Sequence, residues 1–472
     1  NKYFVPSTTI LPPGWHIVYD QATLGFTLRA GGDEIFLWSP DFSNVVDAVR
    51  FDAQANGVPS GRFPDGASTF HALDAQTPGA ANTSAELMIH DVVINEIMYA
   101  PLSGESRDEY VELYNRGTNN IDVSYWRFID GIDYLFQPGT VIPPGGYLVI
   151  GSDVDNLLLK YTQLNPGNAL GNFSGTLSDR GERLALAKPD DPDLPFADLV
   201  VIGEVTYNDG KQWGEWADRG GSSLELIDPR SDNRLSMNWA GSDETDKSVW
   251  TIIENSGPLE QGAAHSSTLV SYHLNVFIPQ KGECLVDDIE VLHSQEGTNN
   301  RIVDPGFDIG LGKWDPNGTH VRSSYNASEG FSSPGSLHVR SSGSGNINGK
   351  ENPGLIDYNY VQRWLSPWLH PGEEATIRAK VRWLAGWPVC VLALEGAYLE
   401  AASQLEVPAN LGSPGLLNSR HAANTGPAIS ELTHRPVLPP AEVAVTVTCR
   451  AHDPDGIVSL TLEYRIDPST TY

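Results

Sequence analysis

Carboxylates and an amide side chain occur together in two short strand-like runs near residue 100. The first run carries Asn95 and Glu96, and the second carries Glu109 and Glu112. Asn95 and Glu96 fall on opposite faces of an alternating run, so neither face is cleanly apolar. A carboxylate inside a sandwich must be paired or hydrogen-bonded. We therefore predict a calcium site built from Glu96, Glu112 and nearby oxygens. The alternatives are a β-bulge that turns Glu96 to solvent, or a carboxylate that accepts backbone N–H groups.

Two further groups of acidic residues have spacings that suit a hard cation. Asp287 and Asp288 lie with Glu290 in one apparent strand, where a structural calcium site and a solvated strand face are the two interpretations. Asp453 and Asp455 flank a proline just before a glycine, an arrangement that is also typical of a plain turn. Calcium is therefore the one cofactor that the sequence suggests.

The densest group of aromatic residues lies between positions 358 and 387. Exposed rings can stack on the flat faces of sugars, while polar neighbours fix the orientation. Trp383 falls on the apolar side of an alternating run and is expected in a core, whereas a Ser-Pro pair between Trp364 and Trp368 predicts a loop there. The predicted carbohydrate-binding residues are Trp364, Trp368, Tyr358 and Tyr360, and the alternative is that the group belongs to a core.

No catalytic set can be recognised in the sequence. It contains no Gly-x-Ser-x-Gly elbow, no His-Glu-x-x-His pair and no phosphate-binding loop. Histidines are scattered, and acidic residues are too numerous for a glycosidase pair to stand out. We therefore predict that these residues are not an enzyme, and we leave that question open for a longer protein that contains them.

Charge and cysteine content narrow the classes of partner. The 472 residues include 60 acidic and 30 basic side chains, and the net charge of −30 repels nucleic-acid phosphates. No apolar run reaches the roughly 18 residues of a membrane-spanning helix, so we predict no membrane insertion. Three cysteines are too few for a disulfide framework, and Cys284 and Cys390 either pair or remain buried thiols.

The sequence predicts that the elements positioning these residues are β-strands. Short β-branched or aromatic runs bounded by Gly, Pro or Asn occur at 92–99, 108–115 and 142–151, and one short helix is predicted at 155–161. Gly (46) and Pro (33) interrupt every longer segment, which indicates an all-β chain. Together the three runs resemble the start of a lamin tail domain, the immunoglobulin-like sandwich of nuclear lamins and of many secreted bacterial proteins. The resemblance implies such a domain at 88–255.

Residues 1–84 repeat the later part of that domain, and self-similarity of this kind marks a duplication. We predict a lamin-tail-like domain that is truncated at its N-terminus, lacks counterparts of 92–115 and has an unpaired sheet edge. A linker rich in helix and strand breakers is predicted at 77–82. The matched segments are 11–18 with 142–149, 32–37 with 181–186, and 49–51 with 205–207.

Residues 266–418 differ in character. The Gly-Phe-Asp of 306–308, followed by Trp314, resembles the opening of jelly rolls in carbohydrate-binding modules. In those modules a Val-Asp-Asp-Ile strand usually comes last, whereas here the run at 286–289 comes first, which indicates a rearranged strand order. The run at 375–384 alternates strictly, with Ile377, Ala379, Val381 and Trp383 on one face.

A linker is predicted at 405–427, and residues 428–472 follow it. These last residues contain two alternating runs, 443–449 and 458–465, on either side of the turn at Asp453. We predict that the two runs pair as the first hairpin of an immunoglobulin-like or fibronectin-like domain that is truncated at its C-terminus.

The predicted fold class is all-β: tandem immunoglobulin-like β-sandwiches, a jelly-roll β-sandwich and a truncated immunoglobulin-like domain. This order resembles large secreted bacterial proteins with lamin tail domains, in which a CotH-type kinase domain often follows, and we interpret the chain as a fragment of such a protein. The resemblance implies a non-catalytic extracellular or cell-surface protein that binds and spaces, with polysaccharide or cell-surface components as partners. Two alternatives stay open. One is an accessory region of a larger enzyme, a CotH-type kinase or a hydrolase, whose catalytic domain lies beyond residue 472. The other is a carbohydrate-binding protein that acts through the jelly roll.

Overall fold

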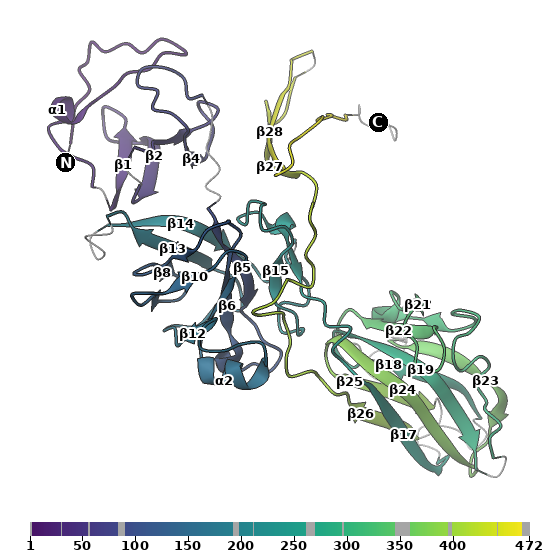
Figure 1. Ribbon diagram of the computed structural model, residues 1–472. Coiled ribbons are helices and arrows are strands. Elements are labelled where there is room, and N and C mark those ends of the chain that lie inside the picture. Colours follow the sequence, from purple (N-terminus) through teal and green to yellow (C-terminus); the bar gives the residue numbers. More distant parts are fainter. Residues whose placement is uncertain are drawn as a thin grey trace.

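The computed structural model describes residues 2–29, 31–54, 57–83, 90–191, 198–210, 212–260, 270–294, 297–344, 359–394, 399–440 and 442–464. Regular structure in these residues is almost entirely β, which confirms the predicted all-β class. Figure 1 shows a small N-terminal unit, two sandwiches and a final hairpin. No helix among the described residues combines the length and hydropathy needed to cross a membrane. The helical elements described are α1 (Gln21–Leu24), α2 (Val154–Lys160) and the single turns η1 (Ser106–Asp108), η2 (Ser236–Asn238) and η3 (Gly318–His320).

The first sandwich packs a six-stranded sheet against a four-stranded sheet around one apolar core. Ile94 and Leu113 of the larger sheet and Leu184 and Ile202 of the smaller one belong to the same buried cluster, as expected for alternating inward side chains. The larger sheet has the order β12 (Ala169–Gly171), β11 (Tyr147–Gly151), β6 (Tyr110–Asn115), β5 (Val92–Met98), β15 (Leu224–Leu226), β16 (Trp239–Gly241). The smaller has the order β14 (Leu199–Thr206), β13 (Arg183–Pro189), β8 (Arg127–Asp130), β9 (Tyr134–Leu135), and β7 (Ile121–Asp122) pairs separately with β10 (Val141–Ile142).

Helix α2 confirms the helix predicted at 155–161, with its bounds shifted by one residue. Asp153 caps its N-terminus by accepting a hydrogen bond from the Asn156 amide at 3.1 Å. Leu157 is buried in the cluster that lies on the outer face of the larger sheet. The helix therefore covers part of that face.

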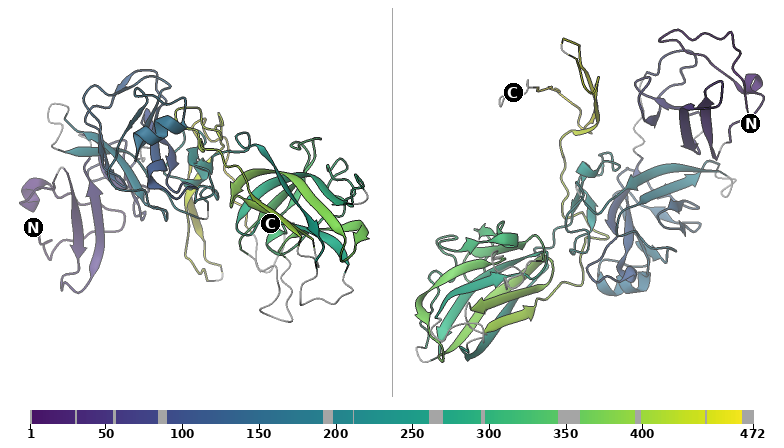
Figure 2. Two further views of the ribbon diagram at one scale, coloured as in Figure 1. Left: turned by 90° about the horizontal axis from the view of Figure 1, so that it is seen from below. Right: turned by 180° about the vertical axis from the view of Figure 1, so that it is seen from behind.

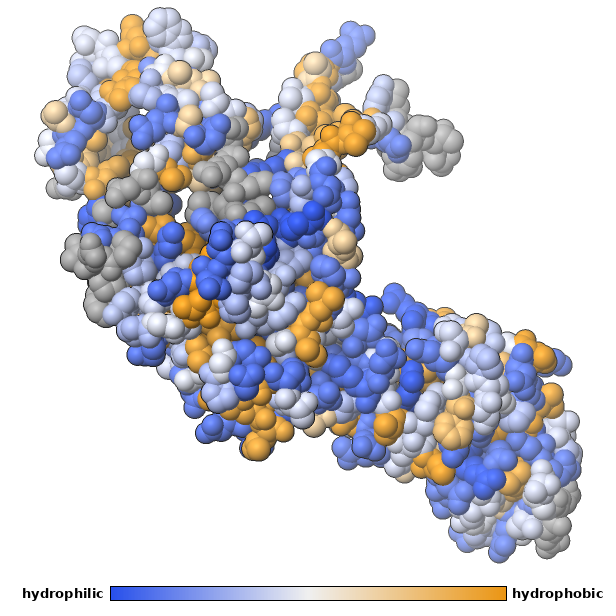
Figure 3. Space-filling view, in the orientation of Figure 1, coloured by the Kyte–Doolittle hydropathy of each residue, from blue (hydrophilic) through white to orange (hydrophobic). Residues whose placement is uncertain are grey.

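The N-terminal unit consists of two hairpins, and most of its residues are exposed. They are β1 (Gly32–Trp38) with β2 (Val45–Asp52), and β3 (Ser60–Arg62) with β4 (Phe70–Ala72). Figure 3 shows hydrophobic side chains on the surface of this unit. The described residues of this unit contain no strand that corresponds to β5 or β6.

The β1–β2 hairpin has the same geometry as the β13–β14 hairpin, at the positions that the sequence aligns. Ile35 pairs with Val49, and Leu184 pairs with Val205. Both hairpins shift register at the equivalent step, after Leu37 in one and after Leu186 in the other. The Pro-Pro-Gly turn is also common to both units, since Gly14 and Gly145 adopt φ of 77° and 67°. Strand β11 follows this turn in the first sandwich, and the described residues after Gly14 contain no counterpart of it.

The second sandwich contains two five-stranded sheets whose facing residues form a common core. The predicted face at 375–384 is confirmed, because Ile377, Ala379, Val381 and Trp383 are all buried. One sheet has the order β17 (Trp250–Pro258), β24 (Glu374–Gly386), β19 (Gly282–His293), β22 (Ser336–Ser341), β21 (Ser324–Asn326). The other has the order β20 (Asp315–Pro316), β23 (Val361–Leu369), β18 (Ser271–Phe277), β25 (Val389–Leu394), β26 (Glu400–Gln404).

The structure corrects three predictions about domain bounds, a linker and strand pairing. Residues 250–255, placed by sequence in the domain at 88–255, belong to strand β17, which pairs with β24 of the second sandwich. Residues 405–427, predicted as a linker, return to the first sandwich and pack on it, as Figures 1 and 2 show. The run at 443–449 pairs backward, as β28 (Thr446–His452) with β27 (Ala428–Arg435), and the described part of 458–465 forms no strand. Alternation marks a strand but does not choose its partner, which explains the last error.

Candidate functional site

Three glutamates lie side by side across the larger sheet of the first sandwich. Glu96 on β5 pairs with Glu112 on β6 and with Glu225 on β15, and all three side chains are completely buried. The register shift between Ile94 and Glu96 is the bulge that the sequence offered as an alternative. It does not turn Glu96 to solvent. It puts neighbouring Asn95 on the same outer face, where both side chains meet the segment at 410–422, here called the strap.

Glu96 is surrounded by hydrogen-bond donors. Its Oε1 accepts from the Tyr110 hydroxyl at 2.5 Å, from the Ser223 hydroxyl at 2.6 Å and from the Ser413 amide at 2.8 Å. The Ser413 hydroxyl lies 3.3 Å from Oε2. The second alternative from the sequence, a carboxylate that accepts a backbone N–H, is therefore what the structure contains.

Glu112 and Asn95 hold the next part of the strap. Glu112 Oε1 accepts from Asn95 Nδ2 at 2.8 Å, and Oε2 accepts from the Gly415 amide at 2.5 Å. Asn418 lies between the strands, where its Nδ2 donates to the Leu226 carbonyl at 2.8 Å and its Oδ1 accepts from Asn95 at 2.8 Å. The strap is thus bonded to three neighbouring strands.

Glu225 completes the row on the β15 side. Its Oε1 accepts from the Ser413 hydroxyl at 2.6 Å, and its Oε2 accepts from the Ser419 hydroxyl and the Arg420 amide, both at 2.8 Å. The start of the strap is fixed by the Tyr161 hydroxyl, which donates to the Leu411 carbonyl at 2.5 Å.

Burial and like charge set the protonation of this row. Burial, reinforced by Glu225, raises the pKa of Glu96 to about 7 even though Ser223, Tyr110 and Ser413 donate to it. Burial, reinforced by Glu96, raises the pKa of Glu112 well above its usual range. Opposed carboxylates on adjacent strands repel each other when ionised, so Glu96 and Glu112 favour proton uptake.

The calcium prediction for Glu96 and Glu112 must take account of these donors. A calcium ion needs about six to eight oxygen ligands. The carboxylate oxygens of Glu96 and Glu112 already accept N–H and O–H groups from the strap. An ion bound at this row would have to displace Ser413 and Gly415. Calcium binding at this row would therefore compete with the hydrogen bonds of the strap.

The other predicted calcium ligands lie apart from the row. Asp287 is fully buried, which excludes the solvated strand face for this residue, and its Oδ2 accepts from the Phe331 amide at 2.6 Å. Burial raises the pKa of Asp287, and the hydroxyl of Ser332 donates to neighbouring Asp288. Asp453 accepts from the Asp455 amide at 2.8 Å in a tight turn, and Asp455 forms an ion pair with Arg230 at 2.8 Å.

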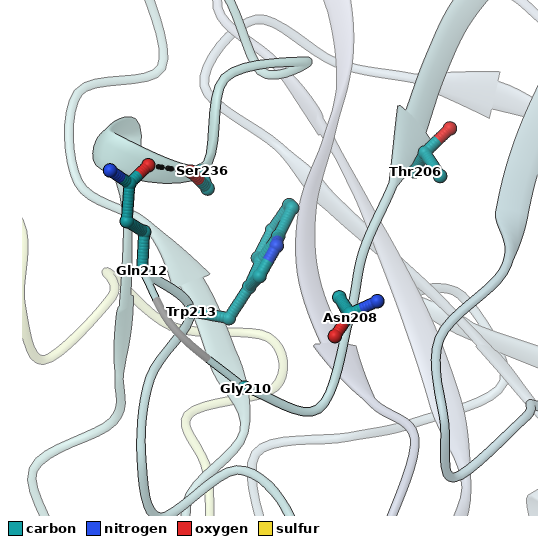
Figure 4. A pocket seen from close by; sticks show the side chains of 6 residues that line it. All are labelled: Thr206, Asn208, Gly210, Gln212, Trp213 and Ser236. Atoms are coloured by element: carbon teal, nitrogen blue, oxygen red, sulfur yellow. Dashed lines mark hydrogen bonds between the residues drawn. The ribbon is translucent and has the colours of Figure 1, made fainter.

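Glu109 is not part of the row. Its Oε2 accepts from the Leu177 amide at 2.8 Å, and burial raises its pKa to about 7. It lines a surface hollow of about 470 Å³ together with Asp179 and Arg219. A second hollow of about 500 Å³ surrounds Trp213, whose ring in Figure 4 lies between the hydrogen-bonded pair Gln212–Ser236 and Asn208.

The aromatic residues predicted to bind carbohydrate differ in their exposure in the second sandwich. Trp364 and Trp368 lie in strand β23 and not in the predicted loop, and they are 54% and 51% exposed. Tyr360 is buried with Phe277 and Val391. Tyr358 lies outside the described residues. Tyr272 of β18, which sequence reasoning missed, stacks on Trp364 with ring centroids 5.4 Å apart and lies 6.2 Å from Trp368. We call these three rings the aromatic platform.

Polar groups lie beside the aromatic platform. Gln362 precedes Trp364 by two positions on β23, so both side chains point to the same outer face. Its Nε2 donates to Asn275 Oδ1 at 3.1 Å across to β18. His273 contacts the edge of Trp364, with centroids 4.0 Å apart. The face therefore combines exposed rings with amide groups.

The structure contains the second of the two cysteine alternatives, free thiols at Cys284 and Cys390. Cys284 and Cys390 are both buried thiols, and they lie on β19 and β25, which belong to the two facing sheets. Burial, and then the neighbouring Cys390, raise the pKa of Cys284. A high thiol pKa disfavours the reactive thiolate.

Comparison with known proteins identifies one part of the chain. The family model of the lamin tail domain matches residues 88–218, which confirms the predicted lamin tail domain for this segment. The match covers the immunoglobulin-like sandwich from β5 to β14 and ends before β15 and the strap. No curated protein and no solved structure matches the chain.

The sequence missed Glu225 and the strap because their relation to Glu96 is not local. Glu225 stands in a three-residue strand, which shows too little alternation to reveal a buried carboxylate. Ser413 lies 317 positions after Glu96. One signal was present: Ser413-Pro414-Gly415 followed by Asn418 resembles the segment at 77–82.

Proposed function

We propose that this chain is a non-catalytic extracellular or cell-surface protein that binds polysaccharide through the aromatic platform of its second sandwich. The lamin tail domain and the first unit would space this platform from other parts of the protein. The observation that carries the proposal is the exposure of the Trp364 and Trp368 rings on either side of half-buried Tyr272, which stacks on Trp364 and contacts Trp368 at a tilt. Apolar rings in this number at the surface are unusual unless they contact a ligand.

The chemistry of the platform favours a sugar over a wholly apolar partner. Sugar rings present flat C–H faces that aromatic rings cover, and their hydroxyls need donors and acceptors at the edge. Gln362 and Asn275 supply amides next to Trp364. A strongly acidic chain also avoids anionic polymers, so neutral polysaccharide is the expected class. The same platform would suit an accessory region of a larger enzyme.

Binding by the complete chain to a panel of neutral polysaccharides tests the proposal. Trp364→Ala and Trp368→Ala are each expected to weaken retention on the bound polysaccharide at least tenfold, a loss of about 1.4 kcal/mol. Trp387→Ala is the matched control, because this residue of the same sandwich is 41% exposed and outside the platform. The proposal fails if no polysaccharide is retained, or if both platform variants bind as the control does.

A further inference from the structure

A six-residue pattern occurs twice in the chain, once after each lamin-tail-like unit. It is Thr77-Pro78-Gly79-x-x-Asn82 in the N-terminal unit, here called the first unit, and Ser413-Pro414-Gly415-x-x-Asn418 in the strap of the first sandwich, here called the second unit. The two copies have the same backbone at the glycine, with φ of 80° at Gly79 and 81° at Gly415. Only glycine adopts this left-handed conformation without strain, so both copies need glycine there.

The final asparagine makes the same contact in both units. Asn82 Nδ2 donates to the Arg62 carbonyl at 2.7 Å, and Asn418 Nδ2 donates to the Leu226 carbonyl at 2.8 Å. Arg62 pairs with Phe70 in the β3–β4 hairpin, just as Leu226 pairs with Trp239 in β15–β16. The hairpins are therefore equivalent, and so are the segments that they hold.

The next residue of each hairpin confirms the equivalence. The Leu73 amide donates to the Pro59 carbonyl at 2.8 Å, and the Ser242 amide donates to the Ser223 carbonyl at 2.9 Å. In the first unit the chain goes almost directly from Leu73 to the pattern at 77. In the first sandwich, by contrast, Ser242 and the pattern at 413 are separated by all ten strands of the second sandwich, β17 to β26.

The first sandwich contacts the fixed positions of the pattern, whereas the variable positions are exposed to solvent. Ser413 and Gly415 donate to the glutamate row, and a Cβ at Gly415 would come within 2.8 Å of Leu164. Asn418 lies between Asn95 and Leu226. Leu416 and Leu417, the two variable residues, are 49% and 59% exposed.

We propose that Glu112, Glu96 and Glu225, with Asn95, form the floor of a peptide-binding groove that recognises Ser/Thr-Pro-Gly-x-x-Asn. The strap of the same chain fills this groove. The second sandwich is accordingly an insertion into the lamin tail domain, held at both of its ends. This inference does not depend on carbohydrate binding.

Cleavage of the connection into the strap tests the groove. A protease recognition sequence is inserted between Pro408 and Ala409 of the complete chain, where Ala409 is exposed. After cleavage, the C-terminal piece should co-elute with the rest of the chain in gel filtration. An excess of the peptide that corresponds to residues 410–420 should release it, whereas a scrambled peptide should not. Retention that the matching peptide does not disturb would overturn the proposal.

Variants in the cleaved chain test the pattern. The triple variant Ser413→Thr, Leu416→Ala, Leu417→Ala converts the strap to the pattern of the first unit, and it should be retained. Asn418→Ala should be released at least tenfold faster than the control Asn424→Ala, which lies outside the pattern. Hydrogen exchange of β13 and β14, on the opposite sheet, should stay slow in every variant and so report a folded sandwich. Equal release of Asn418→Ala and its control would contradict recognition of the pattern.

Discussion

Glu96 is the middle one of three carboxylates in adjacent strands that are buried under neutral donors. Ionised glutamates that face each other across a ladder repel, and burial removes the water that would screen them. Ser413, Ser223 and Tyr110 stabilise the ionised form, but burial outweighs them, because the pKa of Glu96 is raised to about 7. The first sandwich therefore takes up protons when it folds at mildly acidic pH.

The pH dependence of stability follows from this pKa. The folded value of about 7 exceeds the unfolded value of 4.5, so the folded state binds more protons between these limits. The stability that this proton contributes, on the order of 3 kcal/mol, is fully present below pH 4.5 and is lost as pH rises through 7. The melting temperature of the first sandwich should fall from pH 5 to pH 8.

Glu96→Gln should reduce that fall, because glutamine stays neutral and keeps an oxygen that accepts from the Ser413 amide. Glu112 shifts in the same direction, so some pH dependence remains. Thermal melts from pH 5 to pH 8 measure the slope, with exposed Glu105→Gln as the control. A Glu96→Gln slope equal to that of the unsubstituted chain would show that Glu96 is not the group that titrates.

Among the elements, helix α2 and the strap depend on each other. The helix buries Leu157 and brings Tyr161 to the Leu411 carbonyl, which anchors the start of the strap. Its seven residues are too few to be stable alone, so the cap and the packing must hold it. The helix therefore holds the start of the strap in place through Tyr161.

Removing the helix cap should weaken both elements. Asp153→Ala deletes the acceptor of the Asn156 amide and should cost about 1 kcal/mol in the free energy of unfolding. Asp155→Ala, an exposed first-turn substitution without that bond, should change it by less than about 0.5 kcal/mol. Urea unfolding compares the two. Equal losses would show that the cap does not hold the helix.

At the scale of the whole molecule, the two sandwiches are in contact and are not joined by a free linker. The Trp383 ring, fully buried, lies against Gly221 of the first sandwich and the Leu411 side chain of the strap. The Gly386 amide donates to the Gly220 carbonyl at 2.8 Å, and the Ser248 hydroxyl donates to the Trp383 carbonyl. These contacts fix the orientation of the aromatic platform relative to the lamin tail domain.

A methyl group at the contact should separate the sandwiches. Gly221 has φ of 105°, and a Cβ there would lie 2.6 Å from Cη2 of Trp383. Gly221→Ala should therefore lower the free energy of unfolding by about 1–3 kcal/mol through strain and displacement of the ring. Calorimetry should show the two sandwiches melting further apart than in the control Gly203→Ala, which has open space at its Cβ. Identical traces would show that this contact does not couple them.

The sequence by itself determined most of the strands, the all-β class and the presence of a carboxylate that needs partners. It did so because alternation, turn residues and the cost of burying charge act over a few residues. The register shared by the β1–β2 and β13–β14 hairpins agrees with the alignment of their residues. The candidates Trp364 and Trp368 are exposed, although the loop predicted for them is strand β23. Tyr272 was not predicted.

Only the tertiary structure decided what covers Glu96 and where the second sandwich is attached. The strap meets Glu96 across 317 positions of chain, and Glu225 reaches it from a different strand. A hydrogen-bond donor is chosen by proximity in the folded state, and short-range patterns carry no information about that proximity. The strap, rich in Pro and Gly, therefore looked like a linker until the fold placed its amides over buried carboxylates.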